Sequence, residues 1–187
     1  MTPEHRRRRV LKGAALGALA YTVGGAELLL SPREALAQDV PLKVLTPDER
    51  AALEALGDAL LPGARDAGLA HYIDQQLSVP PGEALLMARA VGVMPPYANF
   101  YRAGLAGLDA ASHKAHGAKF AALPQEKRNA FVEDFRQKVP DGWSGPPSPF
   151  FYFVSRADAV DVFYGTVEGF ARLGIPYMPH IAPLKRW

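Results

Sequence analysis

The stretch TPDERAALEALGDALLPG, residues 46–63, decides the fold class. Residues 46–49 combine a capping threonine, a proline at the first helical position and a glutamate three residues after the cap, which is the pattern of a helix start. Apolar side chains then recur at helical spacing on one face: Leu53, Leu56 and Leu60. The Pro62-Gly63 pair ends the helix.

The same helix start and stop signals recur further along the chain. They predict helices over residues 67–77 and 83–90, a longer one after Pro95-Pro96, one opened by Leu123-Pro124-Gln125-Glu126, and one over residues 150–164. Two further apolar faces are expected to be buried: Tyr97, Tyr101, Leu105 and Leu108 on the longer helix, and Phe131, Val132, Phe135 and Val139 on the next. No run alternates with period two, so strands are few or absent. We expect an all-α fold of about five to six helices.

The composition fits one globular domain, because 187 residues are 49% hydrophobic and 21% charged. The chain has no cysteine. Disulfides, haem attachment through C-x-x-C-H, thiolate-held iron–sulfur clusters and cysteine nucleophiles are therefore excluded for this chain.

Residues 1–37 have the three parts of an export signal: a basic start, a weakly apolar stretch from Gly13 to Leu30, and small residues at the end. The basic part matches the twin-arginine pattern through Arg7, Arg8, Val10, Leu11 and Lys12. Ala35 and Ala37 predict cleavage before Gln38, with a retained membrane anchor as the alternative. We expect export to the periplasm by the twin-arginine translocase, which carries folded proteins.

The basic charge of the chain belongs to this segment. Residues 1–37 hold six of the 21 basic and three of the 19 acidic residues, which leaves residues 38–187 with a net charge of −1. No electrostatic basis for nucleic-acid binding remains. Residues 38–187 are expected to form a single domain.

Aromatic residues gather in the C-terminal part of that domain. Nine fall in the last 38 residues, against eight in residues 38–149. The tail from Gly165 is broken by glycine and proline, so it is expected to be irregular and to lie on a surface, either of its own domain or of a partner. We expect residues 146–187 to be a partner-docking region, with these interface candidates: Phe163, Tyr164, Phe170, Tyr177 and Trp187.

The histidine and hydroxyl side chains do not indicate a metal site or a nucleophile. His113 and His116 stand three residues apart at a helix end, but a metal site needs three or four converging ligands, so a solvated helix end is favoured. The run Ser155-Arg156-Ala157-Asp158 indicates a capping arrangement rather than a nucleophile elbow.

Paired carboxylates give no stronger signal. Glu133 and Asp134 are adjacent and diverge, while Asp158 and Asp161 share a helix face without other support for acid–base chemistry. The chain contains no G-x-G-x-x-G, Walker A or H-E-x-x-H motif. No catalytic, cofactor-binding or metal-binding residue is predicted in this chain.

The order of these features resembles the gluconate 2-dehydrogenase subunit 3 family. The resemblance is carried by the twin-arginine signal, the Leu-Leu-Pro-Gly turn at residues 60–63, the Leu-Pro-x-x-x-Arg helix at residues 123–128, and the run DVFYGTVEGF at residues 161–170 followed by LGIPY at residues 173–177. It covers most of residues 45–187.

The resemblance implies a non-catalytic small subunit, exported with a large FAD-binding dehydrogenase subunit of the glucose-methanol-choline type. That partner would oxidise a sugar or sugar acid, and a c-type cytochrome with haem c often takes the electrons. The complex would reach the periplasm on this chain's signal and associate with the membrane. Two alternatives stay open: a stand-alone periplasmic binding or scaffold domain, and an uncharacterised periplasmic enzyme.

Overall fold

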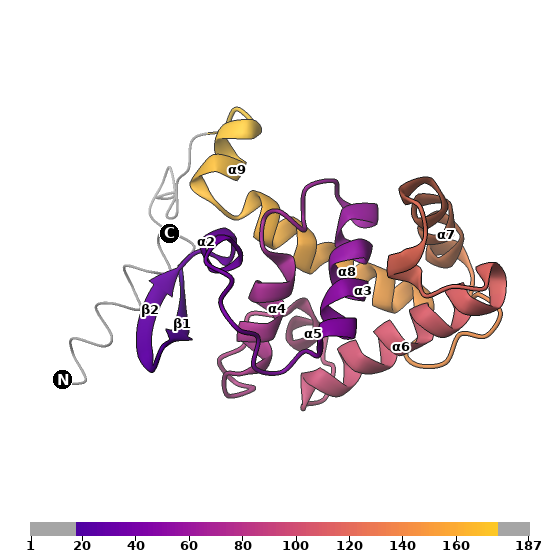
Figure 1. The fold of residues 1–187 in the computed structure, drawn as a ribbon, viewed down its shortest axis with the longest axis horizontal. Helices are drawn as coiled ribbons and strands as arrows, with labels where there is room; N and C mark the ends of the chain where they lie inside the picture. Colours follow the sequence, from indigo (N-terminus) through magenta and orange to yellow (C-terminus); the bar gives the residue numbers. More distant parts are fainter. Residues whose placement is uncertain (1–17, 176–187) are drawn as a thin grey trace, which may run out of the picture.

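The computed structural model describes residues 18–175 (Figure 1). Within that range eight α-helices and a single two-stranded sheet are present, so the expected all-α class is confirmed, with more helices than expected. In chain order the elements are β1 (Leu19–Val23), β2 (Ala26–Leu30), α2 (Pro32–Ala37), α3 (Pro47–Leu60), α4 (Leu69–Leu77), α5 (Met87–Ala90), α6 (Tyr97–His116), the 3-10 helix η1 (Phe120–Ala122), α7 (Gln125–Gln137), α8 (Ser148–Tyr164) and α9 (Val167–Arg172).

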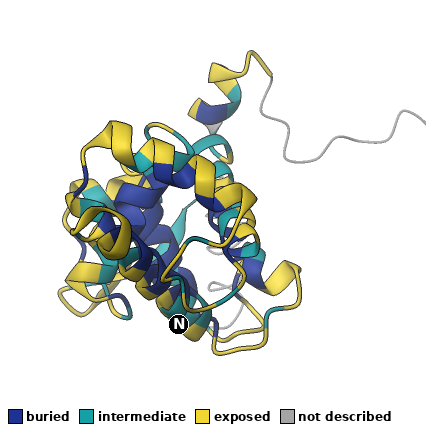
Figure 2. Cartoon of the chain, turned by 90° about the vertical axis from the view of Figure 1, so that its right-hand side faces the viewer, coloured by how far each residue is buried: buried dark blue, intermediate teal, exposed yellow. Residues whose placement is uncertain are grey.

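Helix α3 is the centre of the bundle, since it contacts α4, α6, α7, α8 and η1. The predicted capping box is present: Thr46 accepts from the Glu49 amide, and the Glu49 carboxylate accepts from the Thr46 amide. Leu53 and Leu56 are fully buried. Figure 2 shows the buried faces of the helices turned toward one another around this centre.

Helices α6 and α8 pack through aromatic side chains. All four residues of the predicted α6 face are buried. Phe151 of α8 is fully buried against Gly104 of α6, where any added Cβ would collide with the Phe151 ring. Trp143 bridges this region to α7, with ring centroids 6.0 Å from Phe151 and 5.4 Å from Phe135.

Three predicted helix boundaries were wrong. Helix α4 begins at Leu69 because Gly68 takes a left-handed conformation, with φ of 89°. Residues 83–86 are not helical, since Leu86 is extended and the Leu85 backbone is held by side chains of α4, namely Gln76 and Tyr72. The irregular tail expected from Gly165 contains α9, which Thr166 caps through the Gly169 amide.

Two side-chain predictions were also wrong. Val139 is 59% exposed, because α7 ends at Gln137, ahead of the restriction that Pro140 places on the preceding residue. Ser155 and Asp158 do not cap their own helix: both are fully buried in the middle of α8, and Asp158 accepts instead from the Met87 amide at the start of α5.

Residues 19–40 form a small unit that we call the N-terminal arm, made of β1, β2, α2 and the segment to Val40. The two strands pair in antiparallel register, with Leu19 opposite Leu30 and Val23 opposite Ala26. Most of the arm lies in the segment that the sequence analysis assigned to the export signal. Its α2 and β1 contact α4, at the left of Figure 1.

The contact between Gly104 and Phe151 predicts a stability effect. We expect Gly104→Ala to lower the free energy of unfolding by roughly 1–3 kcal/mol, because the added methyl group overpacks the Phe151 ring. The control is Gly82→Ala, whose Cβ meets no atom within 4 Å and should change stability by less than about 1 kcal/mol. Urea unfolding measures both; equal midpoints for the two variants would contradict this packing.

Candidate functional site

The C-terminal aromatic residues divide into an inner and an outer set. Phe163 is half-buried, lies against Gly63 of the turn after α3, and carries the Arg172 guanidinium 4.9 Å from its ring centroid. Tyr164 meets Phe163 edge-on, with centroids 4.8 Å apart, and is also half-buried. Phe163 therefore ties α9 and the end of α8 to the turn after α3.

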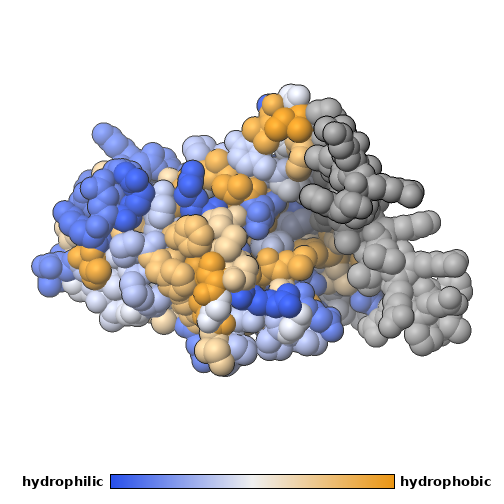
Figure 3. Space-filling model, turned by 180° about the vertical axis from the view of Figure 1, so that it is seen from behind, coloured by the Kyte–Doolittle hydropathy of each residue, from blue (hydrophilic) through white to orange (hydrophobic). Residues whose placement is uncertain are grey.

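The outward surface at this end is aliphatic. Leu173 and Ile175 are 50% and 51% exposed, and Phe170 is half-buried beside them in sequence. Tyr177 and Trp187 lie outside the described residues. Figure 3 shows hydrophobic surface at α9. The structure thus brings Phe163, Tyr164 and Phe170 to one end of the molecule, and adds Leu173 and Ile175, which the sequence analysis did not name.

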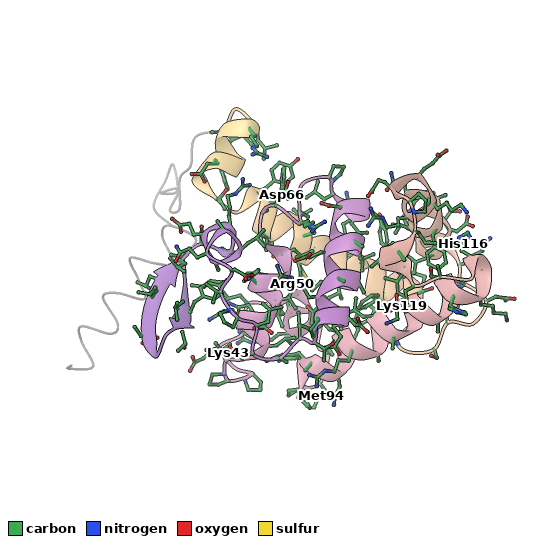
Figure 4. The ribbon with its side chains drawn as sticks, in the orientation of Figure 1. Lys43, Arg50, Asp66, Met94, His116 and Lys119 are labelled. Carbon is green, nitrogen blue, oxygen red and sulfur yellow. The ribbon has the colours of Figure 1, made fainter. Side chains whose placement is uncertain are left out.

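A second apolar surface lies between α4 and α6. Leu85, Val91 and Met94 are 63%, 38% and 81% exposed, and Met94 stands at the lower edge of Figure 4. The sequence analysis did not name this surface: it placed Leu85 in a helix over residues 83–90 and made no prediction for Val91 and Met94. The signal that was available is the set of prolines and glycines on both sides, which keep these side chains out of any long helix.

The most perturbed titrating groups form a buried polar cluster. The Tyr101 hydroxyl donates to Asp158 Oδ2 at 2.6 Å, and the Met87 amide donates to Asp158 Oδ1 at 2.9 Å. Burial raises the pKa of Asp158 to about 7, against the opposing effect of these two hydrogen bonds. Burial, with the nearby Asp158 charge, also raises the pKa of Tyr101.

This cluster cannot act on a substrate in the described conformation. A catalytic acid or base must reach the reacting atom within hydrogen-bond distance, whereas Asp158 and Tyr101 are both fully buried. The cluster instead ties α5, α6 and α8 together. The other carboxylate of the predicted pair, Asp161, is exposed on the outer side of α8.

His71 and Asp74 form a second polar group, on α4. His71 Nε2 donates to the Val40 carbonyl at 3.1 Å, and burial lowers the pKa of His71. Asp74 accepts three backbone N–H bonds, each of 2.8 Å, from Lys43, Val44 and Leu45. The adjoining hollow has a cavity volume of only about 10 Å³, far below the roughly 300–1,000 Å³ of ligand pockets. Asp74 therefore holds the segment that leads into α3.

His113 and His116 are both exposed at the end of α6 (Figure 4), and the His116 ring stands 6.1 Å from Phe131. Glu133 pairs with Arg136 on the surface of α7. Within residues 18–175 no three acidic or histidine side chains gather as a metal site requires. In the same range, no helix is both long and apolar enough to cross a membrane.

The buried Asp158 predicts a pH dependence of stability. Its pKa of about 7 lies above the ordinary 3.8, so its contribution is fully present below pH 3.8 and is lost as the pH rises through 7. Relative to Asp158→Asn, which keeps a neutral side chain of the same shape, the native chain should lose up to roughly 4 kcal/mol across this window.

Urea unfolding between about pH 4 and about pH 8 measures this difference. The exposed Asp141→Asn variant is the control, and it should follow the native chain at every pH. A difference between Asp158→Asn and the native chain that stays constant with pH would contradict the account.

The chain also matches a known protein family. The family described as gluconate 2-dehydrogenase subunit 3 matches residues 47–180, from the first residue of α3 to beyond α9. Comparisons with curated proteins and with solved structures find no match. The family match covers more than half of the chain and agrees with the resemblance seen in the sequence. The chain belongs to the gluconate 2-dehydrogenase subunit 3 family.

Proposed function

We propose that this chain is the non-catalytic small subunit of a periplasmic, FAD-dependent sugar or gluconate dehydrogenase complex of the glucose-methanol-choline type. The observation that carries the proposal is the family match over residues 47–180, because the family is named for subunit 3 of gluconate 2-dehydrogenase. The chain brings the export signal and stabilises the large flavoprotein subunit.

The N-terminal sequence supports the export part of the proposal. Arg7, Arg8, Val10, Leu11 and Lys12 match the twin-arginine pattern, and that route carries proteins that have already folded. A flavoprotein must fold around its FAD before it leaves the cytoplasm. A small subunit with the signal can take such a partner to the periplasm, where the complex associates with the membrane.

The exposed apolar surface supports the docking part. Interfaces are enriched in aromatic residues at their centre, and a few buried side chains dominate the binding energy. At the α9 end, Leu173 and Ile175 are half exposed next to the aromatic residues Phe163, Tyr164 and Phe170. We assign this end, continued by Tyr177 and Trp187, to the contact with the flavoprotein.

The redox groups belong to the other subunits in this proposal. FAD sits on the large subunit, and a c-type cytochrome with haem c is a further subunit that takes the electrons. In the described part of this chain, Tyr101 and Asp158 are the pair with the most strongly shifted pKa values, and both are buried away from solvent. Its role is to hold the helices that present the docking surface.

Export is tested by replacing Arg7 and Arg8 with lysine. The double variant should leave dehydrogenase activity in the cytoplasm, since the translocase recognises the arginine pair. The matched control is Arg6→Lys with Arg9→Lys, which leaves the pair intact and should export normally. Dye reduction by sugars, measured in separated periplasm and cytoplasm, is the readout; periplasmic activity without this chain would contradict the carrier role.

Docking is tested by placing a charge on the exposed aliphatic surface. Ile175→Asp and Leu173→Asp should each weaken the complex about thirtyfold, the effect of losing about 2 kcal/mol at an interface centre. Val139→Asp is the matched control, because Val139 is 59% exposed at the end of α7, away from α9. Flavin absorbance of material captured by an antibody to this chain measures binding.

The same binding assay also identifies the docking surface if it is not at the α9 end. Loss of the flavoprotein in Met94→Asp but not in Ile175→Asp would place docking between α4 and α6 and contradict the assignment above. Capture of the native chain alone, without flavin, would favour a stand-alone domain.

A further inference from the structure

The N-terminal arm is bound to α4 by specific hydrogen bonds as well as by apolar contact. The Tyr21 hydroxyl donates to the His71 carbonyl at 3.2 Å, and Gln75 Nε2 donates to the Ala20 carbonyl at 3.3 Å. At the far end of the arm, His71 Nε2 donates to the Val40 carbonyl. The arm is therefore fixed to α4 at both of its ends.

The arm also has a small core of its own, made by Tyr21, Ala35 and Val40, which are 5%, 0% and 3% exposed. These three residues lie on both sides of the peptide bond between Ala37 and Gln38. The predicted end of the export signal therefore falls inside a packed unit, and removal of residues 1–37 would take Tyr21 and Ala35 away from Val40.

The surface of the helical domain that contacts the arm fits it closely. Gly68, just before α4, lies so close to the Pro32 carbonyl that an added Cβ would collide with it. His71 is 1% exposed, and its Nε2 has its hydrogen-bond partner, Val40, in the arm. Without the arm, the backbone surface at Gly68 and the polar edge of His71 would face solvent.

The bond expected to be cut lies in hydrogen-bonded backbone, with Ala37 and Gln38 exposed on either side of it. The amides of Gln38, Asp39 and Val40 donate to carbonyls of α2, at 3.0, 3.0 and 2.9 Å. At the start of α2, Ser31 and Glu34 form a capping box. Ala35, one of the two small residues that a signal peptidase must accommodate, is fully buried.

A peptidase therefore reaches this bond only through an opened form of the arm. Cleavage of folded protein follows the population of such locally opened states, which is small where the backbone is hydrogen-bonded and the side chains are buried. The twin-arginine route carries folded chains, so the arm can dock before the chain meets the peptidase.

We propose that the N-terminal arm is a permanent structural part of this protein, docked on α4, and that the bond between Ala37 and Gln38 stays uncut while the arm is docked. The exported chain then keeps residues 19–37 as a folded unit. The cleavage part rests on the export part of the proposed function; the docking part does not.

The intact mass of the exported chain tests cleavage. The full-length chain, captured from the periplasm by antibody, should have the mass of a chain that begins at or before residue 18. A main species with the mass of residues 38–187 would overturn the proposal. A chain found only in the cytoplasm would contradict the export proposal, and the docking is then judged by hydrogen exchange alone.

Hydrogen exchange of the purified full-length chain tests docking in either compartment. The amides of β1 and β2 that are hydrogen-bonded across the pair, and the amides of residues 38–40, should exchange slowly. Exchange as fast as in an unstructured peptide would overturn the proposal.

Glycine variants separate arm contact from backbone strain. Gly68→Ala should raise arm exchange about tenfold or more, because its Cβ meets the Pro32 carbonyl. Gly92→Ala is the matched control: its φ of 79° is close to the 89° of Gly68, but its Cβ meets nothing within 4 Å. Equal effects of the two variants on the arm would overturn the proposal.

A second pair of variants leaves the domain itself unchanged. Tyr21→Ala removes the buried ring of the arm and should raise both arm exchange and cleavage before Gln38, with α6 exchange unaltered. Glu27→Ala, at an exposed position of β2, should behave like the native chain. Slow arm exchange in Tyr21→Ala would show that the contacts described above do not hold the arm.

Discussion

The burial of Asp158 is the constraint on which the rest of the structure depends. One carboxylate joins three helices: its own α8, α6 through the Tyr101 hydroxyl, and α5 through the Met87 amide. A buried carboxyl group is stable only where its hydrogen bonds are satisfied, so the three helices can meet in few other ways. Once α6 and α8 are fixed, Phe151 packs on Gly104, and the end of α8 brings Phe163 onto Gly63.

The features that could be predicted from the sequence are those that depend on residues close together in the chain. The capping box of Thr46 and Glu49 and the buried leucines of α3 were readable because both signals lie within one helix. Contacts between residues far apart in the sequence could not be predicted. Residues 83–86 are not helical because Gln76 and Tyr72 bind the Leu85 backbone, and Asp158 was assigned to a capping arrangement because its partner Tyr101 is 57 residues away. The interface candidates Phe163 and Tyr164 lie at one end of the molecule, and the exposed positions of Leu173 and Ile175 depend on α9, which was not predicted.

The two ends of the described range, residues 18–175, differ in how they relate to the helical domain. At the N-terminal end, Tyr21, Ala35 and Val40 are buried and hydrogen-bonded against α4, so the surface is already occupied by the chain itself. At the C-terminal end of the described residues, Phe163 and Arg172 fix α9, while Leu173 and Ile175 just after it are exposed. A small subunit that carries a larger partner needs this division, because one end must be complete before assembly and the other must be free to bind.

The central claim is that this member of the gluconate 2-dehydrogenase subunit 3 family acts as a docking subunit and not alone. Native mass spectrometry of the material captured from the periplasm with this chain tests it most directly. The account predicts an assembly that contains this chain together with a larger, FAD-bearing subunit. A 20.2 kDa chain, or its processed form, found alone with no flavoprotein bound would contradict it.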